Sequence, residues 1–169
     1  MWGKKAKSAN VANAPVEAES KKQTKEEVKS RIAEYQESIE TCEESIKTEL
    51  KALKIAAGNL KLTAKSVSKV KGIFKEKARK KKKYAQKLSA YDESLEEYIR
   101  INSHINWLLN TVSSCYEAKA RLKDQLKEYR AARKIRVKAQ KYLAKVNYNK
   151  SKLEKSVDGI VMPVTSYVR

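Results

Sequence analysis

The sequence has few residues that break helices or fill a large globular core. Its 169 residues include four glycines, two prolines, one phenylalanine and two tryptophans. Both prolines, Pro15 and Pro163, lie near the ends, so no proline interrupts helix formation between them. The interval between them is rich in Ala, Glu, Lys, Leu and Arg, a composition typical of long helices. We therefore expect an elongated all-α structure rather than a compact globule.

The groups that catalysis requires are also scarce. His104 is the single histidine, and no cysteines or carboxylates surround it at the spacing of a metal site. Four scattered glycines cannot form a phosphate-binding loop, and a thin helical hairpin offers no catalytic pocket. We expect no metal, no other cofactor and no enzymatic activity.

The sequence lacks targeting and disulfide signals as well. Cys42 and Cys115 are the two cysteines, which is too few for a disulfide framework and favours a reducing compartment. No apolar run approaches the ~20 residues that span a bilayer, and the first residues lack the apolar core of a signal peptide. These absences predict a cytoplasmic protein.

Positive charge is abundant. The chain has 39 Lys and Arg against 20 Asp and Glu, a formal charge of +19, which favours a polyanionic partner such as a membrane or a nucleic acid. The densest basic stretch, 75–87, has Glu76 as its one acidic residue and no proline or glycine. Charge alternates in blocks, because segment 61–90 has 12 basic residues and one acidic, whereas 91–120 has two basic and five acidic. Such blocks allow one rod to lie against a shifted copy of itself.

Apolar residues at alternating spacings of four and three predict two long helices that pack as an antiparallel hairpin. The first begins after the predicted N-cap Thr24, the turn falls within 58–72, and the second runs from about residue 71 to at least 119. We expect a mobile arm over 1–24, a hairpin core over 25–120, a basic helical segment over 121–155 and a frayed tail over 156–169. With a longer second helix, an overhang would expose apolar residues as a self-assembly surface: Ile105, Trp107, Leu108 and Leu109.

The order of these segments resembles the ESCRT-III family, the charged multivesicular body proteins, and most of all its main filament-forming branch. A Met-Trp start with lysines is followed by a linker, a first helix, and then the pattern KKKKY-x-x-x-L with an acidic amphipathic continuation over 80–99. The likeness covers about residues 1–120. It implies a subunit that polymerises on anionic endosomal or other membranes and remodels or severs them.

The resemblance also implies sites. Membrane insertion falls to the N-terminal residues, and contact with anionic lipid falls to the basic face of the second helix: Trp2, Lys4, Lys5, Lys75, Arg79, Lys82 and Lys83. Assembly with further copies and with related ESCRT-III subunits falls to the second helix and its extension, with these positions: Tyr91, Leu95, Tyr98, Ile105, Leu109 and Val112.

Two features depart from the family pattern. Family members close on themselves through an acidic C-terminal region, whereas residues 119–155 are basic here, so we expect no closure by charge pairing and a chain prone to assembly. The motif that recruits an AAA ATPase through its MIT domain has one weak counterpart, at 160–165.

Two other functions fit the same composition. The charge of +19 suits a helical protein bound to nucleic acid or ribosomes equally well, because phosphate contacts dominate such affinity. The basic residues beside a heptad seam and the lack of an evident base-stacking platform argue against it. A coiled-coil scaffold with incidental charge is the third reading.

Overall fold

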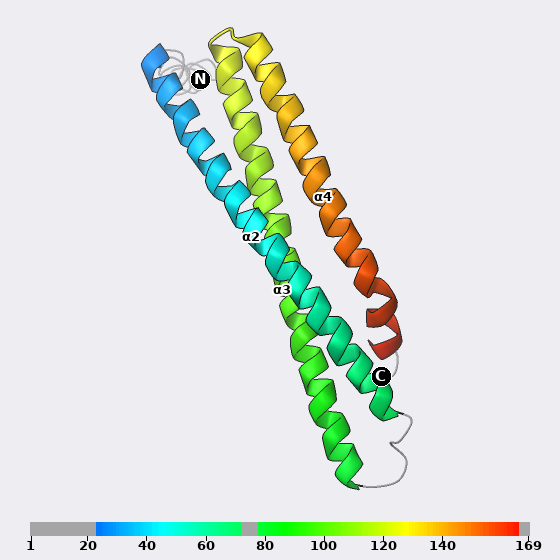
Figure 1. The fold of residues 1–169 in the computed structure, drawn as a ribbon. Helices are drawn as coiled ribbons and strands as arrows, with labels where there is room; N and C mark the ends of the chain where they lie inside the picture. Colours follow the sequence, from blue (N-terminus) through cyan, green and yellow to red (C-terminus); the bar gives the residue numbers. More distant parts are fainter. Residues whose placement is uncertain (1–22, 72–77, 166–169) are drawn as a thin grey trace, which may run out of the picture.

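The fold is an elongated bundle of three antiparallel helices (Figure 1). The structure, a computed structural model, describes residues 23–71 and 78–165, and the side chains of 23–69 and 81–160. Within these ranges the helices are α2 (Lys25–Lys71), α3 (Ala78–Gln125) and α4 (Tyr129–Thr165). Each helix runs opposite to the one before it, so α2 and α4 are parallel. The predicted all-α, elongated helical hairpin with a further C-terminal helix is therefore confirmed.

Helix α2 begins as the sequence predicts and ends later than the first possible turn. The hydroxyl of Thr24 accepts a hydrogen bond from the backbone N–H of Glu27 at 3.2 Å, which is the bond an N-cap makes. The helix continues through Gly58, so the connection to α3 lies between Lys71 and Ala78. Helices α2 and α3 have 47 and 48 residues, or about 70 Å each at ~1.5 Å per residue. The sequence predicted a longer second helix with an overhang. Because the two helices are almost equal in length, both predictions are wrong.

The core follows the apolar stripes that the sequence displays. Along α2 the fully buried side chains recur every seven residues, and they face buried residues of α3. On α2 they are Ile39, Ile46, Leu53 and Leu60, and the buried Val67 continues the spacing. The hairpin seam predicted from the spacing of four and three is confirmed.

Helix α4 covers the part of α3 that was expected to be exposed. Ile105, Leu108 and Leu109 are buried. Of the four residues expected on an exposed overhang, Trp107 alone is exposed, with 61% of its surface accessible. The covering face of α4 is itself apolar, with buried positions at spacings of seven, seven and eleven: Ala132, Ala139, Val146 and Val157. The segment closes on the hairpin although it is basic, because its inner stripe is apolar and its charges point elsewhere. The sequence predicted no closure of 119–155 by charge pairing; the segment closes on the hairpin through its apolar stripe.

Ionic contacts near the α3–α4 turn support the same closure. The guanidinium of Arg136 on α4 lies 3.3 Å from the carboxylate of Glu117 and 2.9 Å from that of Asp124, both on α3. The hydrogen bond from Arg136 is the largest influence on Glu117 and lowers the pKa of its carboxyl. The contact is half-exposed, so we expect it to orient the turn more than to stabilise it.

The α3–α4 turn is short and contains neither glycine nor proline. Lys127 has φ of 60°, and the N–H groups of Lys127 and Glu128 bond the carbonyls of Asp124 and Lys123 at 2.9 Å. These two bonds are those of a Schellman motif, with lysine where glycine is usual. Beyond the turn, α4 continues to Thr165. The turn thus lies a few residues past the expected boundary at 121, and α4 continues into the segment expected as a tail from 156.

Candidate functional site

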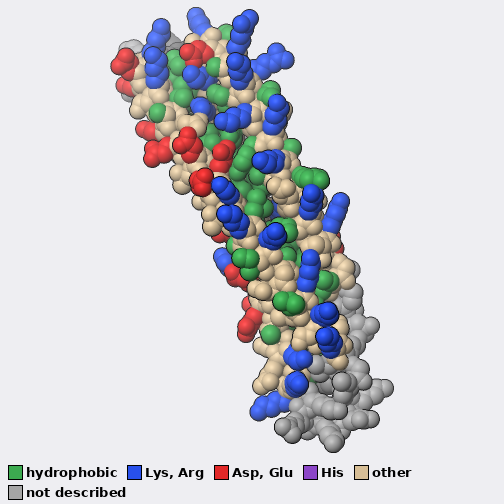
Figure 2. All heavy atoms as spheres, in the orientation of Figure 1, with side chains coloured by type: hydrophobic (Ala, Val, Ile, Leu, Met, Phe, Trp, Pro, Cys, Tyr) green, Lys and Arg blue, Asp and Glu red, His purple; other side chains and the backbone are tan. Residues whose placement is uncertain are grey.

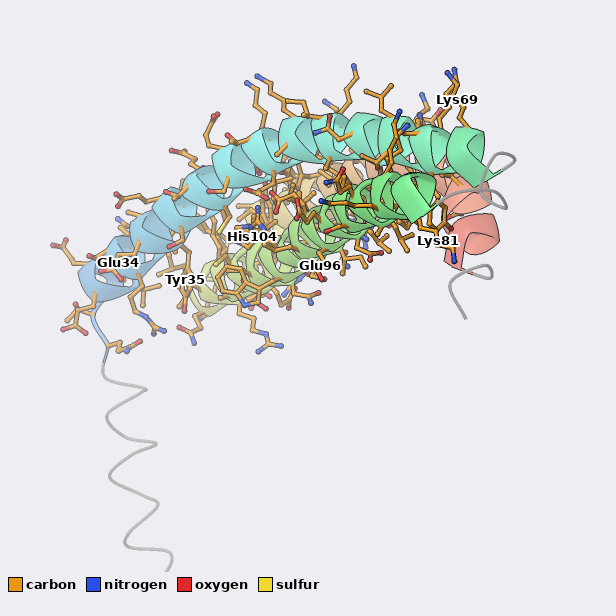
Figure 3. All side chains as sticks on the ribbon, turned by 90° about the horizontal axis from the view of Figure 1, so that it is seen from below. Glu34, Tyr35, Lys69, Lys81, Glu96 and His104 are labelled. Carbon is orange, nitrogen blue, oxygen red and sulfur yellow. The ribbon has the colours of Figure 1, made fainter. Side chains whose placement is uncertain are left out.

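The outward face of α2 carries opposite charges on its two halves. Residues 32–46 include five glutamates and no Lys or Arg, whereas residues 50–71 include six lysines and no Asp or Glu. Figure 3 labels one residue from each half, Glu34 and Lys69, which lie toward opposite ends of the helix. Since both halves bury the same kind of inner stripe, the difference concerns only what each half presents to solvent.

The basic half of α2 also exposes two large aliphatic side chains. Ile55 is 66% exposed and Leu62 is 68% exposed, and seven residues separate them, so they lie on one face of the helix. Exposed lysines adjoin them on that face, and none of these lysines forms an ion pair with a residue that the structure describes. We call this surface the α2 stripe: Lys51, Ile55, Leu62, Lys65 and Lys69.

Its chemistry is that of an interfacial amphipathic helix. Aliphatic side chains enter the boundary between headgroups and acyl chains, while lysines reach the anionic headgroups with their ammonium groups and keep their methylenes in apolar surroundings. The sequence contains the signal for this site, since Ile55 and Leu62 fall outside the heptad stripe and lie among lysines. Tracing only the inner stripe missed them.

The predicted membrane-binding residues lie in part beside this stripe. Lys82 and Lys83 are exposed at the start of α3. Their neighbour Lys81 and Lys69 of α2 lie at the same end of the bundle and point to different sides (Figure 3). Lysines therefore surround this end of the rod. The remaining predicted positions cannot be placed in this way: Trp2, Lys4, Lys5 and Lys75 lie outside the described residues, and Arg79 belongs to α3 without a described side chain.

A second basic surface runs along α4. Residues 129–153 include nine Lys and Arg and no acidic residue. Figure 2 shows these cations along the edge that α4 forms, while Asp and Glu side chains gather along the opposite edge. Two of the nine, Arg136 and Lys150, form ion pairs. The other seven are exposed without an ion pair to any described residue, and we call them the α4 basic face: Arg130, Arg133, Lys134, Lys138, Lys141, Lys145 and Lys152.

Apolar and aromatic side chains interrupt the α4 basic face. Val137 lies in a shallow hollow between the basic side chains that surround it. Tyr129 and Tyr148 are largely exposed, and the ammonium of Lys152 lies 4.5 Å from the centre of the Tyr148 ring. A cation over an aromatic face is held by the ring quadrupole.

The positions expected to mediate self-assembly lie inside the bundle. Five of them are buried, and Leu95 is half-buried against the same cluster. Burial raises the pKa of Tyr98 to about 12, with Glu154 and Asp158 of α4 adding to the effect. In this fold they contact the chain's own helices. Their role in assembly stays a prediction, and it requires a helix to leave the bundle. The five are Tyr91, Tyr98, Ile105, Leu109 and Val112.

A groove between α2 and α3 runs along the acidic half of α2. Glutamates and hydroxyl groups of α2 line it together with His104 of α3, namely Glu40, Thr41, Glu44, Ser45, Thr48 and Glu49. The His104 Nδ1 atom lies 3.4 Å from the Glu49 Oε2 atom, and the His104 ring stacks on Trp107 with centroids 6.0 Å apart. Trp107 thus stands at the rim of an acidic groove.

Little in the described part of the chain suggests reaction chemistry. No group of three or more His, Cys, Asp or Glu there could hold a metal ion. Cys42 and Cys115 are free and half-buried, and burial raises the pKa of the Cys115 thiol, which disfavours its reactive thiolate. None of the helices described is both long and apolar enough to cross a membrane.

Comparison with known proteins adds no assignment. No protein-family model matches the chain, and neither does any curated protein or any solved structure.

Proposed function

We propose that this protein is a filament-forming subunit of the ESCRT-III type, which binds anionic membranes as a peripheral protein and polymerises on them to remodel or sever them. The α2 stripe is the observation that carries the proposal. Nucleic-acid binding calls for cations and stacking aromatics, whereas this stripe combines unpaired lysines with two exposed aliphatic side chains. The two aliphatic side chains gain no free energy from contact with a phosphate backbone, whereas they gain free energy on entering lipid.

The magnitudes favour a weak contact that is multiplied by assembly. Each lysine near an anionic leaflet contributes about 1 kcal/mol, and full burial of an aliphatic side chain contributes about 1.5–3 kcal/mol. Loss of rotational and translational freedom offsets much of this sum for a single rod. Linking many rods in a filament makes the later contacts intramolecular, so binding becomes firm. Endosomal membranes, related ESCRT-III subunits and an AAA ATPase with an MIT domain are the partners that the resemblance adds.

Sedimentation with vesicles tests the proposal. We expect the full chain to pellet with phosphatidylserine vesicles, to stay in solution with neutral ones, and to form filaments visible by negative-stain microscopy on the former. The variant Ile55→Ser with Leu62→Ser should bind at least tenfold more weakly. Ile99→Ser is the matched control, because Ile99 is 53% exposed but follows Glu96 and Glu97. Equal binding by both variants would contradict the proposed site.

Binding to nucleic acid is a second candidate because of the α4 basic face. Its exposed Tyr129 and Tyr148 stand among cations without an ion pair to any described residue, which suits base stacking along a phosphate backbone. An RNA competitor added to the vesicles separates the two functions. Unchanged pelleting favours the membrane, and full release into an RNA complex without filaments favours the nucleic acid.

A further inference from the structure

The acidic groove has the chemistry of a docking site for cations. Glu40 and Glu44 line the groove, and Glu34 and Glu37 are exposed on the same stretch of α2. These four form no ion pair with any described residue, although the chain carries an excess of positive charge. At its rim Trp107 exposes an indole ring next to His104. Tryptophan is enriched at the centre of protein interfaces, and its face attracts Lys and Arg. The groove therefore fits a cationic helix rather than an anion or a small apolar ligand.

The same chain carries a surface of opposite charge that is long enough to cover the acidic stretch. The acidic stretch 32–46 extends over about 22 Å, and the α4 basic face from 130 to 152 over about 33 Å, at ~1.5 Å per residue. Within one molecule the two cannot join, because the inner face of α4 packs on the hairpin and its basic face points to solvent. Figure 2 shows Asp and Glu side chains along one edge of the bundle and Lys and Arg side chains along the other, with further Lys and Arg at the top and across this face.

We propose that the groove between α2 and α3 receives the α4 basic face of a second copy of this chain, with Trp107 against its lysine and arginine side chains. The two surfaces differ, so the contact is heterologous, and a pair of copies still has one free groove and one free α4 basic face. A heterologous contact that does not close into a ring extends into a filament. The inference deepens the filament formation proposed above, and it does not depend on membrane binding.

The contact also makes assembly depend on ionic strength and leaves the membrane-binding surface free. Attraction between exposed charges falls off within a Debye length, about 8 Å at physiological salt, so the contact forms readily at low ionic strength and weakens as salt rises. It leaves the α2 stripe uncovered, since that stripe occupies the other half of α2. A filament built this way presents one stripe per copy to a membrane.

Two charge-reversal variants test the contact by complementation. The groove variant carries Glu37→Lys, Glu40→Lys and Glu44→Lys, and the α4 variant carries Lys134→Glu, Lys138→Glu and Lys141→Glu. All six side chains are exposed. Sedimentation velocity at low salt, without vesicles, should show the unaltered chain in large species and each variant alone at least tenfold weaker in self-association. An equimolar mixture should assemble again, because every contact in it pairs opposite charges.

The outcomes separate this inference from the proposed function. Full assembly by either variant alone, or failure of the mixture when both variants keep their helical melting transition, would overturn the contact. Trp107→Ala changes one exposed side chain and should weaken self-association several-fold; no change would count against its place in the contact. The groove variant should keep the contact of single rods with anionic vesicles through the α2 stripe and lose only the gain that linking rods adds. Complete loss of its vesicle binding would challenge the membrane proposal instead.

Discussion

The two halves of α2 are alike inside and opposite outside. Ile39 and Ile46 in one half and Leu53 and Leu60 in the other are all fully buried against the same hairpin seam. Outside, glutamates and the groove at Trp107 occupy one half, while lysines with Ile55 and Leu62 occupy the other. A helix can serve two purposes because its faces are independent: one stripe determines the fold, and the other is free to select partners.

The largest effect should come from the inner stripe, and it should be the same in both halves. Ile39→Ala and Leu60→Ala each delete buried methyl groups, so each should lower the free energy of unfolding by about 2–5 kcal/mol. Urea denaturation followed by circular dichroism measures both values. If one variant loses about 2–5 kcal/mol in the free energy of unfolding and the other loses almost none, the two halves do not unfold as one cooperative bundle.

Substitutions of exposed residues should affect vesicle binding differently in the two halves, whereas substitutions of buried residues should affect stability alike. Lys51→Glu with Lys65→Glu and Lys69→Glu should weaken binding to anionic vesicles at least tenfold, since three attractions of about 1 kcal/mol become repulsions. Compared at a dilution at which the unaltered chain does not self-associate, the groove variant on the acidic half should bind such vesicles as well as the unaltered chain or better. Both sets are exposed and should change the free energy of unfolding by only about 0.5 kcal/mol or less per site. Equal loss of binding in both sets would contradict membrane contact through the α2 stripe, because the groove variant adds positive charge and leaves the stripe intact.

A smaller effect concerns the tyrosines that pack against each half. Burial, followed by the nearby Glu43, raises the pKa of Tyr142 to about 12, and burial followed by Glu154 raises that of Tyr98 to about 12. An unfolded tyrosine ionises near pH 10. The folded pKa is the higher one, so the stabilisation is complete below about pH 10 and is lost as the pH rises through about 12. Alkaline unfolding should therefore coincide with the appearance of phenolate absorption.

The variant Glu43→Gln tests the contribution of the acidic half. It removes one of the charges that oppose ionisation of Tyr142, so its phenolate should appear at a lower pH, while Tyr98 should be unaffected. The same variant also replaces the carboxylate that accepts the Tyr116 hydroxyl hydrogen bond with a neutral amide, which is why Tyr142→Phe is needed to identify the transition. Identical titrations with and without Glu43 would contradict this influence.

The smallest effect lies at the α3–α4 turn. Lys127 adopts a left-handed backbone conformation, which costs a side chain about 1 kcal/mol and costs glycine almost nothing. Lys127→Gly should raise the free energy of unfolding by about 0.5–1 kcal/mol, measured by urea denaturation. Lys127→Ala is the control and should give no gain, because alanine keeps the β-carbon.

Much of the fold was available from the sequence, since the spacing of Ile39, Ile46 and Leu53 and the cap at Thr24 are local signals. The α3–α4 turn was not, because its left-handed residue is Lys127 and no glycine or proline marks it. The closure by α4 was missed because net charge was weighed above the apolar stripe that includes Val146. The overhang was expected because the first helix was taken to end well before Lys71.

The functional surface was less predictable than the fold. Lysines around 82 and 83 indicated the basic end of the rod, and these two side chains are exposed as expected. Exposure of Ile55 and Leu62, however, follows only when the inner stripe has been assigned, since an apolar residue in a helix is otherwise counted toward the core. The acidic groove depends on His104 and Trp107 coming beside α2, which requires the register of the hairpin.

A spin label placed on either half of α2 tests most directly whether the α2 stripe enters lipid. With Cys42→Ala and Cys115→Ala in place, Leu62→Cys and Glu37→Cys each give one labelled position on the outward face. We predict that anionic vesicles make the label at 62 accessible to oxygen dissolved in lipid and protected from a water-soluble relaxation agent, while the label at 37 stays in water. A label at 62 that stays as accessible to the water-soluble agent as the label at 37 would contradict membrane binding through this stripe.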